Sequence, residues 1–211
     1  MNYPIDIHTH GVSLQKGRAI VNCFPDSFVL EEGCWYSVGI HTWYIQGDVP
    51  MEWTVFEEQI LHPQVLAIGE AGLDKLAQTP MKLQELVFRK QVEWAERVAK
   101  PVLIHLVKAV DELVRLKREL RPVQPWIIHG FRGKAALADM LLHHGFYLSF
   151  GFRFQEAALL RVPADRLFLE TDECDKDIYQ LYRQVALVRG CSYEDLFESV
   201  ARNVKDVFFK Q

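Results

Sequence analysis

Short apolar runs recur along the whole chain, and most of them are continuous rather than alternating with polar residues. Continuous runs are typical of parallel strands that are covered on both faces, whereas a strand with one wet face alternates. We therefore predict eight strands, which cover residues 4–7, 19–24, 36–40, 65–68, 101–104, 126–128, 146–150 and 167–169.

Segments with a helical period lie between many of these strands. The clearest helix follows Thr79 and Pro80, a pair that suits an N-cap and a first helical position. Its apolar residues fall on one side and are Leu83, Val87, Trp94, Ala95 and Val98. Further helices are predicted at 109–120, with Leu113 and Leu116 facing inward, at 134–143 and at 176–188. A last helix begins at the capping box of Ser192 and directs Leu196, Val200, Val204 and Val207 toward the core.

The alternation of eight strands with helices predicts an α/β fold, a closed (β/α)8 TIM barrel. The 211 residues are close to the lower limit of about 200 for this fold, so we expect a small barrel with abbreviated crossovers. The connection between the first two strands is too short for a full helix. No linker divides the chain, and we expect one domain over residues 1–211. A doubly wound open sheet is the structural alternative.

Polar side chains follow directly on five of the apolar runs. The first strand leads into Asp6, His8 and His10, and the others into Glu70, His105, His129 and Asp172. Side chains alternate along a strand, so His8 and His10 project to the same face as Asp6. In a parallel barrel the C-terminal strand ends converge on one mouth, where these groups would meet.

Imidazoles and carboxylates together suit divalent transition metals such as Zn, Mn or Fe, whereas Mg prefers more oxygen ligands. Two ions can be held, and the charges of Glu70 and Asp172 would leave about plus two on the pair, which suits an anionic substrate. The predicted metal ligands are His8, His10, Glu70, His105, His129 and Asp172. A lone histidine after a strand is usually structural, but six such positions at five strand ends favour a metal site.

Two further residues near the predicted mouth have two interpretations each. His41 follows the third strand at the same mouth and either supports a residue that binds the metal or is structural. Asp6 is either a buried carboxylate bonded to backbone amides or a group that orients a ligand histidine.

The composition restricts what the protein can bind. Apolar residues make up 49% and charged residues 25%, which is typical of a globular protein and excludes disordered and collagen-like classes. The net charge of -4 leaves no broad basic surface for nucleic acid, so any phosphate binding must be local.

We expect no membrane or targeting segment, because no run approaches about 18 apolar residues. The four cysteines are far apart, so we expect reduced thiols and a cytoplasmic location.

The chain resembles the TatD family of metal-dependent hydrolases in a set of motifs that occur in order over nearly its whole length. They are Asp6-Ile-His-Thr-His10, Val38-Gly-Ile-His41, Ile68-Gly-Glu-Ala-Gly-Leu-Asp74, Gln84 with Phe88 and Gln91, Pro101-Val-Leu-Ile-His105, His129-Gly-Phe131, Leu169-Glu-Thr-Asp172, and Asn203 with Phe208. The resemblance implies a (β/α)8 barrel with two divalent metal ions (Zn, Mn or Mg) that hydrolyses phosphodiesters, typically DNA. It also implies that the six ligands named above match the metal positions and that Asp172 is the general base.

The chain departs from the family pattern in three loops. Leu106-Val107-Lys108 stands where Ser-Arg-Asp is usual, and Arg132 stands where a Ser is usual. The segment 173–177 is short and acidic where the family has a Pro-Tyr loop with basic residues. We expect Arg132 and Lys108, with His41, to contact the substrate. The alternative for Arg132 is that it caps or covers the following helix.

The first functional hypothesis is a metal-dependent phosphodiesterase, a TatD-like deoxyribonuclease in which Asp172 and Glu70 are the catalytic residues. The second is hydrolysis of a small amide or lactone on the same barrel, and the third is a metal-binding barrel without turnover. The expected partner is DNA or a smaller phosphodiester as substrate, with no membrane and no obligate protein partner.

Overall fold

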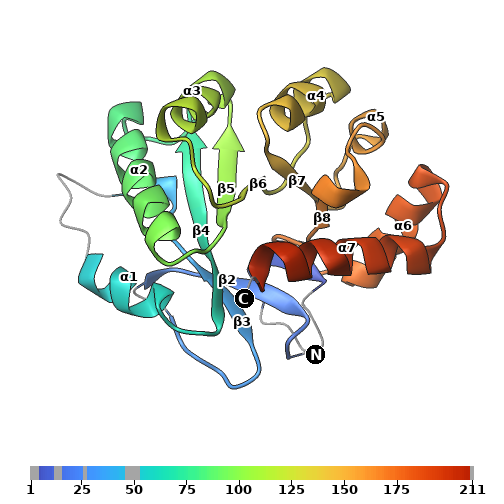
Figure 1. The fold of residues 1–211 in the computed structure, drawn as a ribbon, viewed down its shortest axis with the longest axis horizontal. Coiled ribbons are helices and arrows are strands. Elements are labelled where there is room, and N and C mark those ends of the chain that lie inside the picture. Colours follow the sequence, from blue (N-terminus) through green and yellow to red (C-terminus); the bar gives the residue numbers. More distant parts are fainter. Residues whose placement is uncertain (1–4, 12–15, 26–27, 46–52, 210–211) are drawn as a thin grey trace.

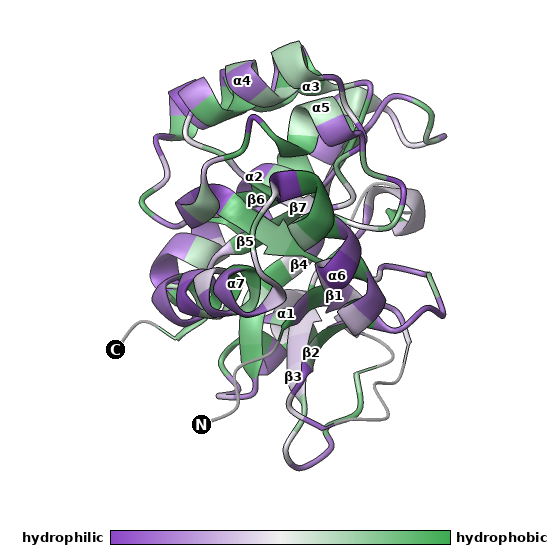
Figure 2. Ribbon diagram, turned by 90° about the vertical axis from the view of Figure 1, so that its right-hand side faces the viewer, coloured by the Kyte–Doolittle hydropathy of each residue, from purple (hydrophilic) through white to green (hydrophobic). Residues whose placement is uncertain are grey.

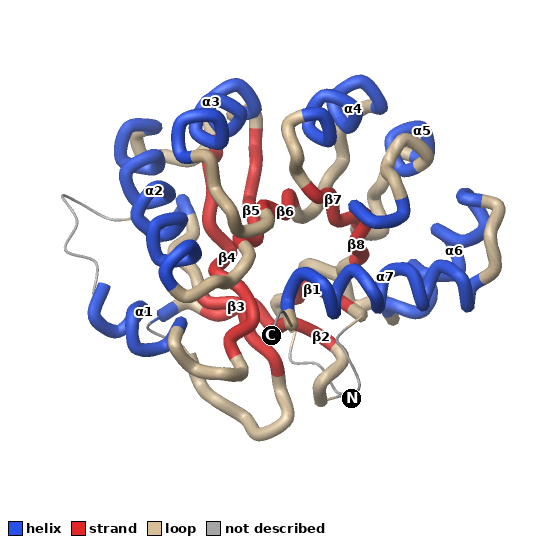
Figure 3. Tube along the Cα trace, viewed as in Figure 1, coloured by secondary structure: helices blue, strands red, loops and turns tan. Residues whose placement is uncertain are grey.

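Eight parallel strands form the centre of the molecule, in a computed structural model that describes residues 5–11, 16–25, 28–45 and 53–209. Each strand pairs with the next one along the chain (Figures 1 and 3). The strands are β1 (Asp6–Thr9), β2 (Ala19–Cys23), β3 (Trp35–Val38), β4 (Val65–Asp74), β5 (Val102–Val107), β6 (Trp126–Ile128), β7 (Tyr147–Phe150) and β8 (Leu167–Leu169).

The sheet closes through contacts between the end of β1 and the residues after β8. Thr9 forms a parallel bridge with Asp172. The amide of Asp172 donates to the carbonyl of His8 over 2.9 Å, and the amide of His10 donates back to the carbonyl of Asp172 over 3.0 Å. The predicted (β/α)8 barrel is therefore confirmed, and the open doubly wound alternative is excluded because the first and last strands meet.

Among the described residues, one α-helix follows each strand from β3 to β7, and two follow β8. They are α1 (Trp53–Ile60), α2 (Met81–Arg97), α3 (Val110–Leu120), α4 (Ala135–His143), α5 (Glu156–Leu159), α6 (Ile178–Arg189) and α7 (Tyr193–Phe208). α5 has only 4 residues, which confirms an abbreviated crossover after β7. Over the described ranges, no helix is both long and apolar enough to cross a membrane.

The core lies between the strands and the inner faces of the helices. Figure 2 shows the apolar strands β5, β6 and β7 surrounded by helices that carry both apolar and hydrophilic residues. Trp126 of β6 has no exposed surface and packs its ring 5.1 Å from Phe88 of α2. The predicted inward residues of α3 and α7 are buried, since Leu113, Leu116 and Val200 have no exposed surface. Ser192 caps α7 as predicted, because its hydroxyl accepts from the amide of Asp195 over 3.0 Å.

The predicted N-cap role of Thr79 is wrong. α2 begins at Met81, its N-cap is Pro80, and no side chain caps it. The hydroxyl of Thr79 instead donates to the carbonyl of Thr42 over 2.9 Å. Thr79 therefore ties the loop after β4 to the loop after β3, an interaction between distant segments that local sequence does not reveal.

Two glutamines of α2 are buried, although the apolar periodicity of the helix does not predict this. Gln84 accepts from the amide of Asp74 over 2.7 Å and donates to the carbonyl of Asp74 over 2.9 Å. Gln91 makes the same pair of bonds with Ile40, at 2.7 and 3.1 Å. Each glutamine satisfies backbone groups that have no partner in the sheet. The helix thereby fixes the strand ends that carry the functional side chains.

The predicted bounds of β4 and β5 were too short. β4 continues through Glu70 to Asp74, and β5 continues through His105 to Val107. Gly72 pairs with His105, and a Cβ at Gly72 would lie only 1.9 Å from the carbonyl oxygen of His105. A glycine is needed there for the two strands to approach. β1 also begins later than predicted, at Asp6, and Pro4 of the predicted range lies outside the described residues.

Candidate metal centre

All six predicted metal ligands lie together at the C-terminal mouth of the barrel, around the carboxylate of Glu70. Glu70 is 5% exposed and stands in the middle of β4. Its two oxygens face different groups of histidines. The site therefore has two halves that share one carboxylate.

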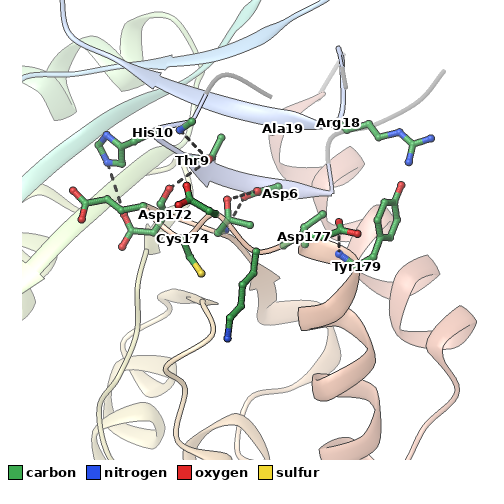
Figure 4. Close-up of a pocket in the computed structure, with 15 residues that line it drawn as sticks. Asp6, Thr9, His10, Arg18, Ala19, Asp172, Cys174, Asp177 and Tyr179 are labelled. Carbon is green, nitrogen blue, oxygen red and sulfur yellow. Dashed lines mark hydrogen bonds and ion pairs between the residues drawn. The ribbon is translucent and has the colours of Figure 1, made fainter. Parts of the chain in front are cut away.

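The first half surrounds Oε2 of Glu70. This oxygen lies 3.6 Å from Nε2 of His8 and 3.3 Å from Nε2 of His10. Oδ1 of Asp172 lies 3.9 Å from Nε2 of His8 and 3.8 Å from Nε2 of His10 (Figure 4 shows the His10 contact). Donor atoms around one tetrahedral ion with bonds near 2.0–2.1 Å lie about 3.4 Å apart. These four residues are thus spaced to share one ion.

His8 gives the clearest sign that this half fits a metal. Its ring has no exposed surface, and neither ring nitrogen makes a hydrogen bond with any described residue. Burial, together with the charge of His129, lowers the pKa of the His8 imidazole to about 3, so the ring is neutral and offers a lone pair. A buried polar atom without a partner is costly. An ion between His8, Glu70 and Asp172 would give the Nε2 atom of His8 a partner.

The second half surrounds Oε1 of Glu70. This oxygen lies 2.7 Å from Nε2 of His129 and 2.8 Å from Nδ1 of His105. The other nitrogen of each ring faces a carboxylate. Nε2 of His105 lies 3.2 Å from Oδ2 of Asp74, and Nδ1 of His129 lies 3.3 Å from Oε1 of Glu170. A metal-binding histidine commonly donates its remote N–H to such a carboxylate, which leaves the near nitrogen free for the ion.

Sequence reasoning assigned no role to Asp74 and Glu170, although both sit at strand ends. Asp74 is held in turn by the indole Nε1 of Trp43 over 2.8 Å and by the amide of Leu76 over 2.7 Å. Glu170 has no exposed surface and accepts from the amide of Gly130 over 2.6 Å. Side-chain alternation is the signal that could have found both, because Asp74 stands four positions after Glu70 and Glu170 two before Asp172.

Burial and the neighbouring charges shift the pKa values of the centre in opposite directions. Burial alone would raise the pKa of Glu70, but the imidazoles of His129, His10 and His105 hold it well below its usual range. Burial would likewise lower the pKa of His129, but Glu70 and Glu170 raise it well above its usual range. The imidazole of His129 and the carboxylate of Glu70 therefore each favour the charged form of the other. Metal binding and protonation compete for such groups.

His41, predicted to touch the substrate, lies at the same mouth with 4% exposure. Its Nδ1 accepts from the amide of Trp43 over 3.2 Å, so the neutral ring carries its hydrogen on Nε2. That nitrogen lies 3.4 Å from Oε1 of Glu70. In this tautomer His41 is a hydrogen-bond donor toward the centre rather than a ligand.

Asp6 joins the two strand ends that carry ligands. Its carboxylate accepts from the hydroxyl and the amide of Thr171, over 2.6 and 3.0 Å, and from the amide of His8 over 3.3 Å. Burial raises its pKa to about 7 against the effect of these bonds. The contacts are those of a carboxylate bonded to backbone amides, the first of the two interpretations.

Arg132 and Lys108 both lie at the mouth. Nη2 of Arg132 is 3.7 Å from Oδ2 of Asp172, and its side chain lines a cavity of about 200 Å³ with Arg153 of the loop after β7. Lys108 is exposed directly after β5, with a left-handed backbone φ of 53°. A larger cavity of about 610 Å³ adjoins the centre, and Figure 4 shows His10 and Asp172 at one end of it. Arg132 and Arg153 therefore border the carboxylate-rich centre from two neighbouring loops.

The closed barrel is of the (β/α)8 class, and histidines and carboxylates that could hold metal ions converge at its C-terminal mouth. Within that class, the sequence model of the family described as "TatD related DNase" matches residues 7–209. The chain belongs to the TatD family.

Curated relatives carry names that agree with this assignment. The uncharacterized metal-dependent hydrolase YabD of Bacillus subtilis is 32% identical over 72% of this chain and 68% of its own length. The 3'-5' ssDNA/RNA exonuclease TatD of Klebsiella pneumoniae is 32% identical over 66% of this chain and 57% of its own length. The chain thus spans little more than half of that relative.

Two solved structures share the fold. The TatD homologue YjjV of Escherichia coli superimposes with a TM-score of 0.85 at 15% identity, covering 100% of this chain and 99% of that one. The hydrolase TatD family protein of Entamoeba histolytica gives a TM-score of 0.79 at 16% identity, with the same coverage of both chains. At these identities the likeness concerns the fold alone.

Proposed function

We propose that this protein hydrolyses phosphodiester bonds of a single-stranded nucleic acid or a smaller phosphodiester, using two divalent ions held around Glu70. The observation that carries the proposal is the division of the Glu70 carboxylate, whose Oε2 faces His8 and His10 while its Oε1 faces His105 and His129. A carboxylate placed in this way suits a ligand that bridges two ions. The names of the Bacillus and Klebsiella relatives, a metal-dependent hydrolase and an exonuclease for ssDNA and RNA, support the same activity.

The donor set favours Zn or Mn over Mg. Besides His41, four imidazoles face the Glu70 carboxylate, and Asp172 adds a second carboxylate. Magnesium prefers oxygen ligands and retains water, whereas imidazole suits transition metals. Divalent ions bound there would supply a water of lowered pKa and would neutralise charge on the phosphate.

Asp172 is the residue placed to accept a proton. Oδ1 faces His8 and His10, while Oδ2 lies toward the open mouth and Arg132. Its backbone φ of 57° is left-handed, a conformation unfavourable for most residues that turns this side chain into the mouth. A carboxylate there can take the proton of the attacking water within hydrogen-bond reach. His41 Nε2, as a donor, would hold an oxygen of the bound phosphate.

Arg132 is the best placed cation for the substrate phosphate. Its guanidinium reaches toward Asp172 from the loop after β6, and its side chain is 54% exposed. A planar guanidinium can hold two phosphate oxygens by paired charge-assisted bonds. Lys108, after β5, would add a point charge. Together they would replace the Arg that the family has where this chain has Val107.

A smaller substrate is the second candidate, and the loop after β8 favours it. Glu173, Asp175 and Asp177 line the larger cavity, so several negative charges stand beside the route of a long polyanion. Hydrolysis of a small amide or lactone belongs to the same candidate, because bound ions also polarise a carbonyl.

Metal analysis combined with a substrate panel tests the proposal. The purified protein, loaded with Zn, Mn or Mg, is assayed on single- and double-stranded DNA, RNA, small phosphodiesters, amides and lactones. We expect metal-dependent cleavage of phosphodiesters that is lost in Glu70→Ala and kept in His144→Ala, a control at the opposite end of the barrel. Cleavage of amides or lactones alone would replace the proposal with the second candidate. An absence of turnover on every substrate would favour the non-catalytic barrel.

The state of the thiols indicates a location in the cell. Cys23, Cys34, Cys174 and Cys191 are free. Free thiols fit a reducing compartment, and we propose the cytoplasm.

A further inference from the structure

Two exposed aromatic side chains stand at the rim of the metal centre. Trp43 is 60% exposed and Tyr44 57% exposed. They are the large exposed aromatic side chains among the described residues, and both follow His41 in the short helix Thr42–Tyr44. Single exposed apolar side chains are ordinary, but adjacent ones that form a patch often mark a binding surface. Their position next to the centre, rather than elsewhere on the surface, points to the substrate.

The indole of Trp43 is held rigidly against the centre. Its ring lies 4.9 Å from the ring of His41 and 5.8 Å from the ring of His105, nearly perpendicular to both. Its Nε1 donates to Asp74 over 2.8 Å. Leu76, which is 66% exposed, binds the other oxygen of Asp74 through its amide and extends the apolar surface. The indole is therefore fixed by its edge while much of its surface stays open to solvent.

We propose that Trp43 is a stacking platform for an unpaired nucleobase of the nucleotide whose phosphodiester is cleaved. This inference rests on the proposed function and deepens it, because it names the part of the substrate that gives selectivity. A base is one sugar away from its phosphate, so a phosphate at the ions brings its base to the rim where Trp43 stands. Aromatic side chains bind bases of any sequence in this way, because every base has a π-face.

The distribution of charge around the mouth favours a nucleic acid strand over a protein segment as the molecule that binds to Trp43. Trp43 follows β3, whereas Arg132 and Arg153 follow β6 and β7 on the other side of the barrel mouth. A single strand that crosses the mouth would place a base on the indole and its neighbouring phosphate on the arginines. A base pair within a duplex has no free face to offer, so the platform selects single strands.

The test compares a base-bearing strand with one that lacks bases. KM and kcat are measured on oligothymidylate and on an abasic sugar-phosphate strand of the same length. Wild type is expected to prefer oligothymidylate. Trp43→Ala should raise KM for oligothymidylate on the order of tenfold or more and should remove the preference, whereas Trp43→Phe, which keeps a ring, should retain it.

A second variant separates stacking from the hydrogen bond to Asp74. Asp74→Asn disturbs His105 and should lower turnover on both strands by the same factor, leaving their ratio unchanged. A purely structural role for Trp43 would give that same pattern for Trp43→Ala and would overturn the platform. A change in the oligomeric state of Trp43→Ala without a change in the ratio would assign the surface to a second copy of the chain, which also overturns it.

A binding measurement without catalysis distinguishes a failure of the stacking proposal from a failure of the proposed function. After chelation of metal, oligothymidylate should quench tryptophan fluorescence of wild type more strongly than the abasic strand does, and this difference should vanish in Trp43→Ala. Equal quenching by both strands, with phosphodiester cleavage intact, would refute the platform alone. A loss of all phosphodiester cleavage with selective quenching present would refute the proposed function and leave base binding supported.

Discussion

Nδ1 of His129 lies 3.3 Å from Oε1 of Glu170, a carboxylate with no exposed surface. The same oxygen accepts from the amide of Gly130 over 2.6 Å, so its position is fixed by the backbone of the strand end that carries His129. Glu170 thus determines which nitrogen of His129 is free to face Glu70. His105 and Asp74 repeat the arrangement in the same half of the centre, at 3.2 Å.

Removing the charge of Glu170 should weaken metal binding without removing a ligand. We expect Glu170→Gln to lower metal affinity by about 10- to 100-fold, since groups that orient a ligand histidine contribute to that extent. Glu173→Gln, an exposed acidic neighbour, is the control and should bind metal as wild type does. Metal titration monitored by calorimetry measures both. Equal affinity of Glu170→Gln and wild type would show that His129 needs no orienting partner.

The position of Glu70 between the two halves of the centre predicts the metal stoichiometry. Reconstituted wild type should hold more than one equivalent of divalent ion. Glu70→Ala should hold less, because a carboxylate with one oxygen in each half contributes to both ions. Elemental analysis after removal of unbound metal gives the number. If Glu70→Ala kept the wild-type content, Glu70 would not belong to the site.

Asp172 is predicted to be a ligand and a proton acceptor. Asp172→Asn keeps the shape of the side chain and removes its charge, so turnover should fall at least about 100-fold, the usual contribution of a general base. Measured metal content must accompany the rates. Near-normal turnover with the metal retained would assign proton transfer to another group.

Arg132 is predicted to bind the substrate phosphate. Arg132→Ala should raise KM for a phosphodiester several-fold with little change in thermal stability, because the side chain is 54% exposed. Arg132→Lys should recover only part of the affinity, since a lysine lacks the planar fork. Arg161→Ala, which removes an exposed ion pair with Asp139, is the matched control. Identical kinetics of Arg132→Ala and wild type would leave the metals as the phosphate ligands and favour a small substrate.

Gln91 is predicted to stabilise the fold by binding the segment that follows β3. Gln91→Ala leaves the buried amide and carbonyl of Ile40 without their partners, so the free energy of unfolding should fall by about 1–3 kcal/mol for each unsatisfied group. Gln180→Ala, at an exposed position of α6, should change it by less than about 0.5 kcal/mol. Urea denaturation followed by circular dichroism compares the two. Equal stability of both variants would show that water replaces the glutamine.

The sequence alone determined the barrel and the residue types at its mouth. Continuous apolar runs identify buried parallel strands, and the polar residues that end them stand out because burial of an unpaired polar group is costly. Ser192 and the inner face of α7 were also predictable, since helix capping and helical periodicity depend on neighbours within a few residues. The departure at Val107 and Arg132 could likewise be recognised from the order of motifs.

Only the tertiary structure decided how these residues act on one another. Strand alternation places His8 and His10 on one face, but closure between Thr9 and Asp172 brings Asp172 beside them. The pairing of His129 with Glu170, the tautomer of His41 and the burial of Gln84 each depend on contacts between segments far apart in the chain. The local sequence shows which side chains are polar. The distances between these side chains are set by the fold, and those distances determine which atoms can bind a metal.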